Sequence, residues 1–320
     1  MVQLLLVSAS FAAAGPRDLY LVTPEDRTAV EGELLSLVAK TAESGVEALS
    51  ISINGRDTAR ITVTQASGFQ CKTVKLDAGP NKITVKAVKS DGSVVTDSVT
   101  VFYRSDISKE FNFIPGGFAR KPFHQRKNEA VCAPCHDIDQ PEGDVKPDTP
   151  KASRCYQCHK ALTDYRYVHG PVATWSCLSC HMKNSQPVRY ETQKPERESC
   201  YVCHVDEKRQ WAGKAFVHGP TATGKCSICH NPHASDNPFW LKKPGWDLCV
   251  ACHGELVHRT KSFPLINKPH PTKGGIDPRR PGKELSCESC HEPHAASTEN
   301  LFGFDVESVF QLCDRCHPKK

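Results

Sequence analysis

Sixteen of the 17 cysteines fall into one five-residue pattern, Cys-x-x-Cys-His, which occurs eight times and is numbered here as motifs 1 to 8 in chain order. Its cysteines are Cys132, Cys135, Cys155, Cys158, Cys177, Cys180, Cys200, Cys203, Cys226, Cys229, Cys249, Cys252, Cys287, Cys290, Cys313 and Cys316. Its histidines are His136, His159, His181, His204, His230, His253, His291 and His317. Two cysteines three positions apart lie on one helical turn, so both thiols can bond to one porphyrin edge while the next imidazole ligates the iron. The pattern is that of c-type haem attachment, and it predicts eight haem c groups, each with one iron.

Zinc sites and disulfide bonds are the other common uses of paired cysteines. Zinc often binds two Cys-x-x-Cys pairs, but it places no demand on the residue after the second cysteine. That residue is histidine in all eight copies, although the chain has only 15 histidines in 320 residues. Eight disulfides between such close cysteines would constrain almost none of the chain. The pattern therefore favours haem over both alternatives.

The motifs come in pairs, which indicates an internal repeat of four two-haem modules. The first cysteines of a pair are 23 residues apart in modules 1 to 3 and 26 residues apart in module 4. A histidine precedes each module: His124, His169 and His218 lie eight residues before the first cysteine, and His270 lies seventeen residues before it.

Eight irons with two axial ligands each need eight ligands beyond those that the motifs supply. Seven histidines remain for these places, namely His124, His169, His218, His233, His258, His270 and His294. His233 and His294 follow a motif histidine by three residues, so each lies on the same side of the porphyrin as that ligand. Either residue can then ligate only the iron of a neighbouring haem. We expect such crossed ligation to hold adjacent haems close together, as electron transfer requires.

One iron is left without a histidine by this count. At the positions that match His233 and His294, module 1 has Asp139 and module 2 has Asn184. The missing ligand is Met182, a lysine, the processed N-terminal amine, or nothing. An iron with an open axial position would be a candidate catalytic site.

The formal net charge of +5 and the pI of about 8.4 would suit a polyanionic partner. Each ferric haem with two neutral histidines adds one negative charge, so eight haems change the formal charge from +5 to −3, and full reduction changes it to −11. We expect the lysines and arginines to neutralise haem propionates, and we expect no nucleic-acid partner.

Residues 124–320 give 197 residues for eight haems, too few for a separate apolar core. We predict a domain with little regular secondary structure, in which short helices and loops surround the haems and folding depends on haem attachment. Segments 137–154 and 268–283 are rich in Pro, Gly and charge, which predicts loops. We expect the four tryptophans to pack on porphyrin faces.

The N-terminal part has no haem motif and shows short segments of alternating polarity, such as 49–53, 61–64, 82–88 and 99–103. The turn sequences Asn54-Gly55 and Asp91-Gly92 lie between them, which predicts a small all-β sandwich over 15–106, followed by a linker over 107–123. The stretch 69–88, with Leu-Asp-Ala-Gly-Pro-Asn at its centre, resembles bacterial immunoglobulin-like modules of exported proteins. Cys71 is expected to be a buried apolar residue of this sandwich.

Residues 1–14 are apolar and end in three alanines, which predicts a signal peptide that is cut before Gly15. No Lys or Arg precedes the run, so the expected signal is shortened at its start. The run is too short to span a bilayer, and a mean hydropathy of −0.46 excludes a protein with many membrane spans. We expect an exported chain with no transmembrane span after processing.

The signatures Cys-His-Asn-Pro-His-Ala-Ser and Cys-His-Glu-Pro-His-Ala-Ala, together with the paired motifs, make residues 124–320 similar to the doubled C-x-x-C-H multihaem cytochromes. The resemblance implies a chain of low-potential haems with two histidine ligands each. It also implies electron transfer in the periplasm, across the outer membrane or in extracellular filaments. The partners it implies are redox proteins, an outer-membrane porin or further copies of the chain.

An enzyme is the alternative function. The ligand deficit would suit an octahaem oxidoreductase of the hydroxylamine type, or one that acts on nitrogen or sulfur oxyanions at one open haem. Some of those reductases have lysine in place of a motif histidine, whereas all eight motifs here end in histidine. The sequence therefore predicts an electron-transfer protein rather than an enzyme.

Overall fold

The computed structural model describes residues 18–41, 45–63, 68–141, 152–259, 270–304, 306 and 309–317. The expected signal peptide over 1–14 lies outside these ranges. The chain divides into two compact units: Met1–Tyr103 with Ile114–Lys121, and Arg104–Phe113 with Pro122–Lys320. Across the described residues, every helix is too short or too polar to span a lipid bilayer.

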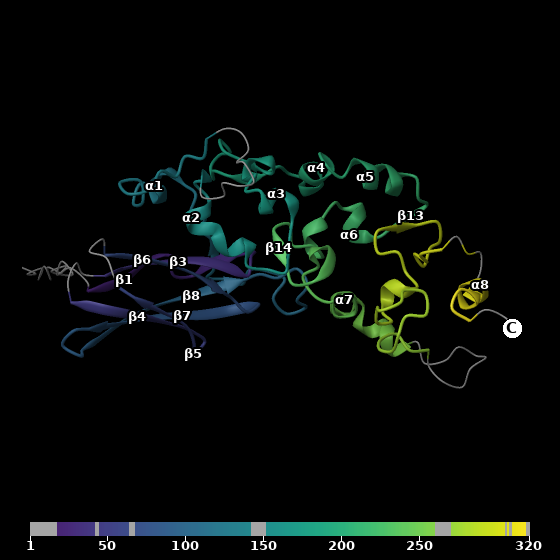
Figure 1. The fold of residues 1–320 in the computed structure, drawn as a ribbon, viewed down its shortest axis with the longest axis horizontal. Helices are drawn as coiled ribbons and strands as arrows, with labels where there is room; N and C mark the ends of the chain where they lie inside the picture. The colour runs from purple at the N-terminus through teal and green to yellow at the C-terminus, as the bar shows by residue number, and fades with distance from the viewer. Residues whose placement is uncertain are drawn as a thin grey trace, which may run out of the picture. The chain divides into compact units, whose positions relative to one another are not determined.

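The first unit is built from two β-sheets that face each other (Figure 1). The smaller sheet has the strand order β1 (Leu19–Thr23), β3 (Leu34–Thr41) and β6 (Phe69–Lys75). The larger sheet has the order β5 (Arg56–Thr62), β4 (Val46–Ile53), β7 (Gly79–Lys89), β8 (Val94–Tyr103), β2 (Thr28–Val30) and β9 (Ala119–Arg120). Neighbouring strands are antiparallel except where β2 pairs with β8 and β9. The predicted β-rich, sandwich-like N-terminal region is thus confirmed.

The alternation in the sequence becomes the hydrophobic core between these sheets. Ile51 on β4 and Ile83 and Val85 on β7 are fully buried, while the residues between them point to the other face. Burying each such side chain stabilises the fold by about 1.5–3 kcal/mol. Asn81 is also fully buried, and its amide nitrogen donates to the carbonyls of Asp77 and Gly79 at 2.8 and 2.9 Å.

The predicted turn at Asn54 and Gly55 is present in the structure. Asn54 and Gly55 join β4 to β5 with φ values of 52° and 79°, a left-handed pair that suits a two-residue hairpin turn.

The expectation for Cys71 is wrong, because its side chain is exposed. The cause is the register: Cys71 pairs with Val38 of β3, so its side chain lies on the face of the sheet opposite to the buried Leu37 and Ala39.

The second unit is mostly loop, with short helices and two-residue strands. Its α-helices are α1 (Arg126–Glu129), α2 (Tyr156–His159), α3 (Gly170–Ala173), α4 (Glu196–Tyr201), α5 (Val205–Ala212), α6 (Gly219–Ala222), α7 (Gly245–Arg259) and α8 (Val309–Asp314). Its 3₁₀ helices are η2 (Lys160–Thr163), η3 (Cys177–Ser179), η4 (Cys226–Ile228), η5 (Pro238–Trp240) and η6 (Cys287–Ser289). The C-terminal region of short helices and loops that carries the motifs is therefore as predicted. Parts of the predicted loops, at 142–151 and 268–269, lie outside the described residues.

Pairs of two-residue strands join one module of this unit to the next. β10 (Tyr167–Val168) pairs with β14 (Ala234–Ser235), and β13 (Phe216–Val217) pairs with β15 (Ala295–Ala296). One further pair, β11 (His181–Met182) with β12 (Glu191–Thr192), lies within module 2. The first two pairings place segments from successive modules side by side, although the partners are more than 60 residues apart in sequence.

Candidate haem sites

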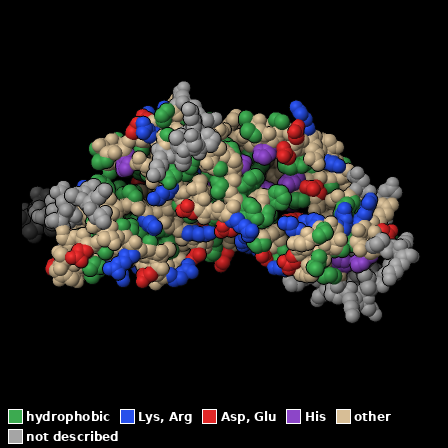
Figure 2. Space-filling view, in the orientation of Figure 1, with side chains coloured by type: hydrophobic (Ala, Val, Ile, Leu, Met, Phe, Trp, Pro, Cys, Tyr) green, Lys and Arg blue, Asp and Glu red, His purple; other side chains and the backbone are tan. Residues whose placement is uncertain are grey.

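The backbone of the motifs has the geometry that thioether attachment needs. In motif 1 the amide of His136 donates to the carbonyl of Cys132 at 2.9 Å, and in motif 8 the amide of His317 donates to that of Cys313 at 2.8 Å. Motifs 2, 4, 5 and 7 close the same turn, with distances of 2.9 to 3.1 Å. This turn places both cysteines on one side and brings the histidine beside them. Figure 2 shows histidine side chains at the surface of the molecule, among hydrophobic ones.

Six motif histidines each face one of the seven remaining histidines. The pairs are His159 with His124, His181 with His233, His204 with His169, His230 with His294, His253 with His218, and His317 with His270. Their ring centres lie between 5.9 Å and 6.4 Å apart. No described pair joins two motif histidines or two of the others.

This spacing fits an iron held between the two rings. An imidazole ligates a metal at about 2 Å through one nitrogen, and its ring centre lies about 1 Å further, so two imidazoles on opposite sides of one iron have centres about 6 Å apart. The chemistry of the donor set agrees, because each pair combines a histidine beside two thiols with a histidine from elsewhere in the chain. The residues present therefore fit haem with two axial histidines at these six motifs.

Short local sequences position the second histidine of these pairs. His169 and His218 have extended backbones and directly precede α3 and α6, which begin with Gly-Pro. Proline suits the first turn of a helix, so the chain changes direction at the histidine. The amide of His169 donates to the carbonyl of His233, and that of His218 donates to the carbonyl of His294, each at 2.9 Å. The strand pairs β10–β14 and β13–β15 thus hold together two candidate ligands that face neighbouring motifs.

Hydrogen bonds at Nδ1 orient the motif histidines. The ring Nδ1 of His181 lies 2.6 Å from the carbonyl of Tyr190, that of His230 lies 2.7 Å from Phe239, and that of His291 lies 2.8 Å from Asn300. In each case the acceptor is nine residues further along the chain. A donor at Nδ1 fixes the tautomer in which Nε2 is the metal-binding nitrogen.

The acceptors for the other histidines fall into two classes. His169, His218 and His270 each have a proline carbonyl 2.9 Å from Nδ1. His124 and His294 instead have a carboxylate: Glu129 lies 3.1 Å from Nδ1 of His124, and Glu292 lies 3.0 Å from Nδ1 of His294. These carboxylates were not among the predicted site residues. The signal for Glu292 was its place in the Cys-His-Glu-Pro-His signature, whereas no sequence pattern marked Glu129.

Burial keeps several of these imidazoles neutral, which is the form that binds a metal. Burial, together with smaller effects of the neighbouring His124 and His181, lowers the pKa of His159 to about 4. Burial likewise lowers the pKa of His233 to about 4. The pKa values of His218 and His230 are also lowered, mainly by burial. At neutral pH these rings therefore carry no charge.

Four of the predicted metal ligands are not among these described pairs. Among the described residues, His136 and His291 face no second imidazole. The side chain of His258 lies outside the described residues, so its place is not given. Met182 lies on β11 with 45% of its surface exposed, and no described contact joins its sulfur to either unpaired motif histidine.

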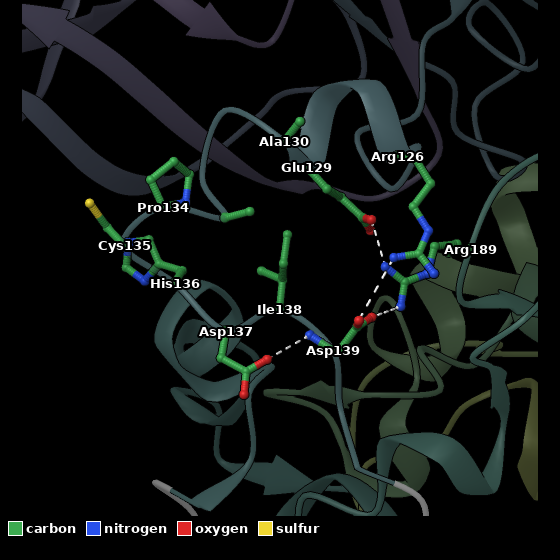
Figure 3. A pocket seen from close by; sticks show the side chains of 11 residues that line it. Arg126, Glu129, Ala130, Pro134, Cys135, His136, Asp137, Ile138, Asp139 and Arg189 are labelled. Atoms are coloured by element: carbon green, nitrogen blue, oxygen red, sulfur yellow. Dashed lines mark hydrogen bonds and ion pairs between the residues drawn. The ribbon is translucent and has the colours of Figure 1, made fainter.

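A cavity of about 630 Å³ lies beside motif 1 (Figure 3). Cys135 and His136 line one side of it, and Arg189 lines the opposite side with Glu129 and Asp139 (Figure 3). Arg189 is 3% exposed; it donates to Glu129 at 2.6 Å and pairs with Asp139, which lowers the pKa of Asp139. Asp139, which replaces the histidine of the Pro-His element, is thus held by an arginine.

The cavity residues offer contacts for a haem with propionate groups. The Nε atom of Arg189 is buried and has no hydrogen-bond acceptor in the structure. A propionate oxygen would supply the acceptor that a buried guanidinium requires. The site residues that sequence reasoning missed here are Arg189 and Glu129, which are 60 residues apart in the chain and belong to no motif.

Thiol contacts connect the motifs in the order of the chain. The second motif of each of the first three modules touches the first motif of the next through Cys155 with Cys177, Cys200 with Cys226, and Cys249 with Cys287. The hydrogen bond from Cys177 lowers the pKa of Cys155 to about 6, and equivalent bonds lower the pKa of Cys226 and Cys287 to about 7.

Within modules, a second set of thiols lies close enough for the charge of one to raise the pKa of the other. These neighbours are Cys132 with Cys158, Cys180 with Cys203, Cys229 with Cys252, and Cys290 with Cys316. Together the two sets connect all eight motifs, from 1 to 8, without a break.

Only one group among the described residues has three metal-binding atoms close together. Atoms of Glu196, Cys200 and Cys226 lie within 4.8 Å of one another. Structural zinc takes four ligands, and both oxygens of Glu196 are already bonded to Ser227, at 2.5 and 2.7 Å. The group follows from the thiol contact between motifs 4 and 5, and it gives the zinc interpretation no complete site.

The chain was compared with known proteins at the levels of family, sequence and structure. The model of the doubled CXXCH motif family matches residues 169–209, 218–258 and 280–320. No curated protein matches the chain.

Solved structures with local similarity include fibronectin(III)-like modules of Clostridium thermocellum CbhA, with 19% identity, a TM-score of 0.23 and coverage of 27% of this chain and 94% of that chain. CopC from Methylosinus trichosporium OB3b has 23% identity, a TM-score of 0.19 and the same two coverages. The superoxide reductase (neelaredoxin) of Ignicoccus hospitalis has 7% identity and a TM-score of 0.23, and the match covers 27% of this chain and 79% of that one. Similarities this weak carry no functional argument, whereas the three matches to the doubled CXXCH family support a multihaem c-type cytochrome.

Proposed function

We propose that the chain is an octahaem electron-transfer protein that conducts electrons along a row of eight covalently bound c-type haems. The observation that carries this proposal is the set of six histidine pairs, each with a motif histidine and a second histidine about 6 Å apart. Haem bound in this way supplies reversible one-electron exchange without an open position for a substrate.

The proposed row follows the chain from motif 1 to motif 8. The neighbouring thiols support this order, because each cysteine would carry the edge of its haem and the cysteines of successive motifs lie near one another. Hydrogen bonds between modules join first cysteines, whereas in modules 2 to 4 the neighbouring thiols within a module are second cysteines. Along most of the row, each motif therefore has one thiol near the preceding motif and one thiol near the following motif.

Crossed ligation would stiffen this row. His233 of module 3 faces His181 of module 2, and His294 of module 4 faces His230 of module 3. In both pairs, the residue three positions after a motif histidine faces the motif two places earlier in the row. The residue that would face motif 1 by this rule is Asn184, which follows the motif 3 histidine by three positions. We therefore assign the histidine deficit to motif 1 and the remaining histidine, His258, to motif 7.

The sixth ligand of motif 1 then decides between two functions. With Met182, a lysine or the N-terminal amine in that place, all eight haems only carry electrons. With no ligand, the cavity beside His136 and Arg189 would admit a small substrate, and the protein would be an octahaem oxidoreductase for nitrogen or sulfur oxyanions. The cavity also provides the space for the haem itself, so it favours the enzyme only weakly.

We further propose that the protein is exported and acts in the periplasm, across the outer membrane or in extracellular filaments. Its partners would be redox proteins, an outer-membrane porin or copies of itself. The β-sandwich unit would be an immunoglobulin-like module that docks the haem unit onto a partner or packs subunits together. The paired motifs support this location, since covalent haem attachment is typical of exported cytochromes.

Haem content and spin state test the proposal. Intact mass and a pyridine haemochrome assay of the purified protein should give eight haems per chain. A mass that matched bare polypeptide, or polypeptide with zinc, would refute the haem assignment. In low-temperature EPR of the oxidised protein, a wholly low-spin spectrum would exclude the enzyme, and a high-spin ferric signal of one haem in eight would favour it.

Two variants locate the ligands in the same measurement. His233→Ala should convert one further haem in eight to the high-spin form, because it removes the second ligand at motif 3. Asn184→Ala is the matched control, since it occupies the equivalent place in module 2 and should leave the spectrum unchanged. Met182→Leu should create a new high-spin signal only if the methionine sulfur is the sixth ligand at motif 1.

A further inference from the structure

Glu292 and Asn231 occupy the same position in two successive modules. Each follows a motif histidine and precedes a Pro-His element, in Cys-His-Glu-Pro-His and Cys-His-Asn-Pro-His. Both side chains accept a hydrogen bond from the backbone amide of that second histidine: Asn231 from His233 at 3.1 Å, and Glu292 from His294 at 3.3 Å. The two residues therefore hold the same loop in the same way.

The glutamate makes one further contact that the asparagine does not make. Its Oε1 atom lies 3.0 Å from Nδ1 of His294, so the ring N–H donates to a carboxylate. Among the described residues, no carboxylate bonds to the ring of His233. The indole of Trp211 stacks on the His294 ring, with centres 4.5 Å apart and planes inclined by 17°, and this contact holds the ring in place.

A carboxylate at Nδ1 changes what the imidazole does at its other nitrogen. The ring becomes a stronger electron donor through Nε2, and the nearby negative charge favours the more positive oxidation state of a bound iron. The opposite ring of this pair, His230, donates to the carbonyl of Phe239 at 2.7 Å, so both axial rings have an acceptor. His169 and His218 have neutral proline carbonyls instead.

Glu129 makes the same type of contact to His124, but its charge is balanced. Arg189 donates to Glu129 at 2.6 Å, and the side chains of both residues are less than 5% exposed. The guanidinium offsets the charge that the carboxylate brings to the ring. Among the described residues no lysine or arginine forms an ion pair with Glu292; the charge of Lys214 acts on it only from a longer distance. The charge of Glu292 is therefore offset less directly than that of Glu129, which accepts a hydrogen bond from Arg189.

We propose that Glu292 is a positioning residue that lowers the midpoint potential of the haem held between His230 and His294. The proposal rests on the electron-transfer function above. The reaction concerned is the gain of one electron by ferric iron from a neighbouring haem, with no bond made or broken. The haem at motif 5 would then have a lower potential than the haem at motif 3, where Asn231 takes the place of Glu292.

Exchanging the two residues tests this directly. In a potentiometric titration of the full-length holoprotein, followed by haem absorbance, Glu292→Gln should move about one eighth of the total amplitude to a more positive potential. Asn231→Glu should move one eighth in the opposite direction. In EPR of the oxidised protein, each substitution should shift the g values of one low-spin haem and create no high-spin signal. The control is Glu299→Gln, which removes the same charge from an exposed site in module 4 and should leave the titration curve in place.

An unchanged curve for Glu292→Gln in a protein that carries its full haem content would overturn the proposal. If that variant does not assemble, the reciprocal Asn231→Glu variant decides, and an unchanged curve there has the same meaning. Absence of covalent haem from the wild-type protein would instead refute the proposed function, so the two failures are distinguishable.

Discussion

The two units of the chain differ in how many hydrophobic side chains they bury. The first unit holds 16 of the hydrophobic residues that are buried among the described part of the chain, and most of them form one cluster between its two sheets. The second unit is about twice as long but holds only six: Trp175, Ala234, Leu248, Ala295, Ala296 and Val306. A unit with so little apolar burial cannot offset the conformational entropy of its chain with side-chain packing alone.

The difference shows two ways in which parts of one chain can offset the conformational entropy that folding costs. The sandwich obtains its stability from alternating strands, so its fold is encoded residue by residue. In the second unit, histidine rings and thiols are arranged around places that suit porphyrins, and large hydrophobic side chains such as Val202 and Phe239 are exposed. Porphyrin surfaces would cover such side chains and act as the core.

The largest expected effect is on a chain made without haem attachment. We expect its first unit to fold and its second unit to stay unfolded, because metal and cofactor binding supply the folding free energy where no preformed core exists. Limited proteolysis followed by mass spectrometry should then yield a resistant fragment that ends near Lys121, whereas the holoprotein should resist over its whole length. Equal protection of both units in the haem-free chain would show that haems are not the core.

A cavity in the sandwich should have a smaller effect, confined to one unit. Ile51 is fully buried on β4, so Ile51→Ala should destabilise the first unit by about 2–5 kcal/mol. Denaturant unfolding followed by far-UV circular dichroism measures this loss. The unfolding transition of the second unit, followed by haem absorbance in the same samples, should be the same as in the wild type. Val94→Ala is the control, because Val94 is 55% exposed on β8 and its truncation should change the stability by less than about 0.5 kcal/mol. A change in haem absorbance with Ile51→Ala would mean that the units unfold together.

The same contrast explains what the sequence could predict. Strands β4, β7 and β8 and the turn at Asn54 were predictable, because alternation and turn chemistry are local. The shape of each motif was predictable for the same reason. The exposure of Cys71 was not, because the face of the sheet on which it lies depends on the register of β6 with β3, a pairing of segments that are distant in sequence.

Which histidine faces which motif depends on contacts that span long stretches of chain. The offset of three residues predicted that His233 and His294 would reach a neighbouring haem, but not which one. The answer comes from β10–β14 and β13–β15, which are only two residues long and carry no recognisable strand pattern. The ion pair of Arg189 with Glu129 could not be predicted for a similar reason. The two residues are 60 positions apart in sequence, and neither belongs to a recognisable motif.

The smallest expected effect is a pH dependence of the second unit that comes from one buried carboxylate, Asp277. Burial would raise the pKa of Asp277, but hydrogen bonds from Ser289 and Arg280 outweigh it and lower the pKa to about 2. Because the folded pKa lies below the ordinary aspartate value of 3.8, the ionised carboxylate stabilises the fold above about pH 4, and this contribution is lost as the pH falls toward 2. The side chain of Asp277 is 1% exposed, so the shift corresponds to about 2 kcal/mol at neutral pH.

Asp277→Asn should therefore lower the stability of the holoprotein's second unit at pH 7 and flatten its dependence on pH between about 4 and 2. Denaturant unfolding at a series of pH values, followed by haem absorbance, measures both effects. Asp247→Asn is the matched control, since Asp247 pairs with Lys273 at 3.2 Å in a half-exposed position and should contribute less than about 1 kcal/mol. Equal losses in the two variants would mean that the loop around Asp277 is held by haem contacts rather than by its own hydrogen bonds. The second unit would then depend on its cofactors even where its side chains form a buried network of their own.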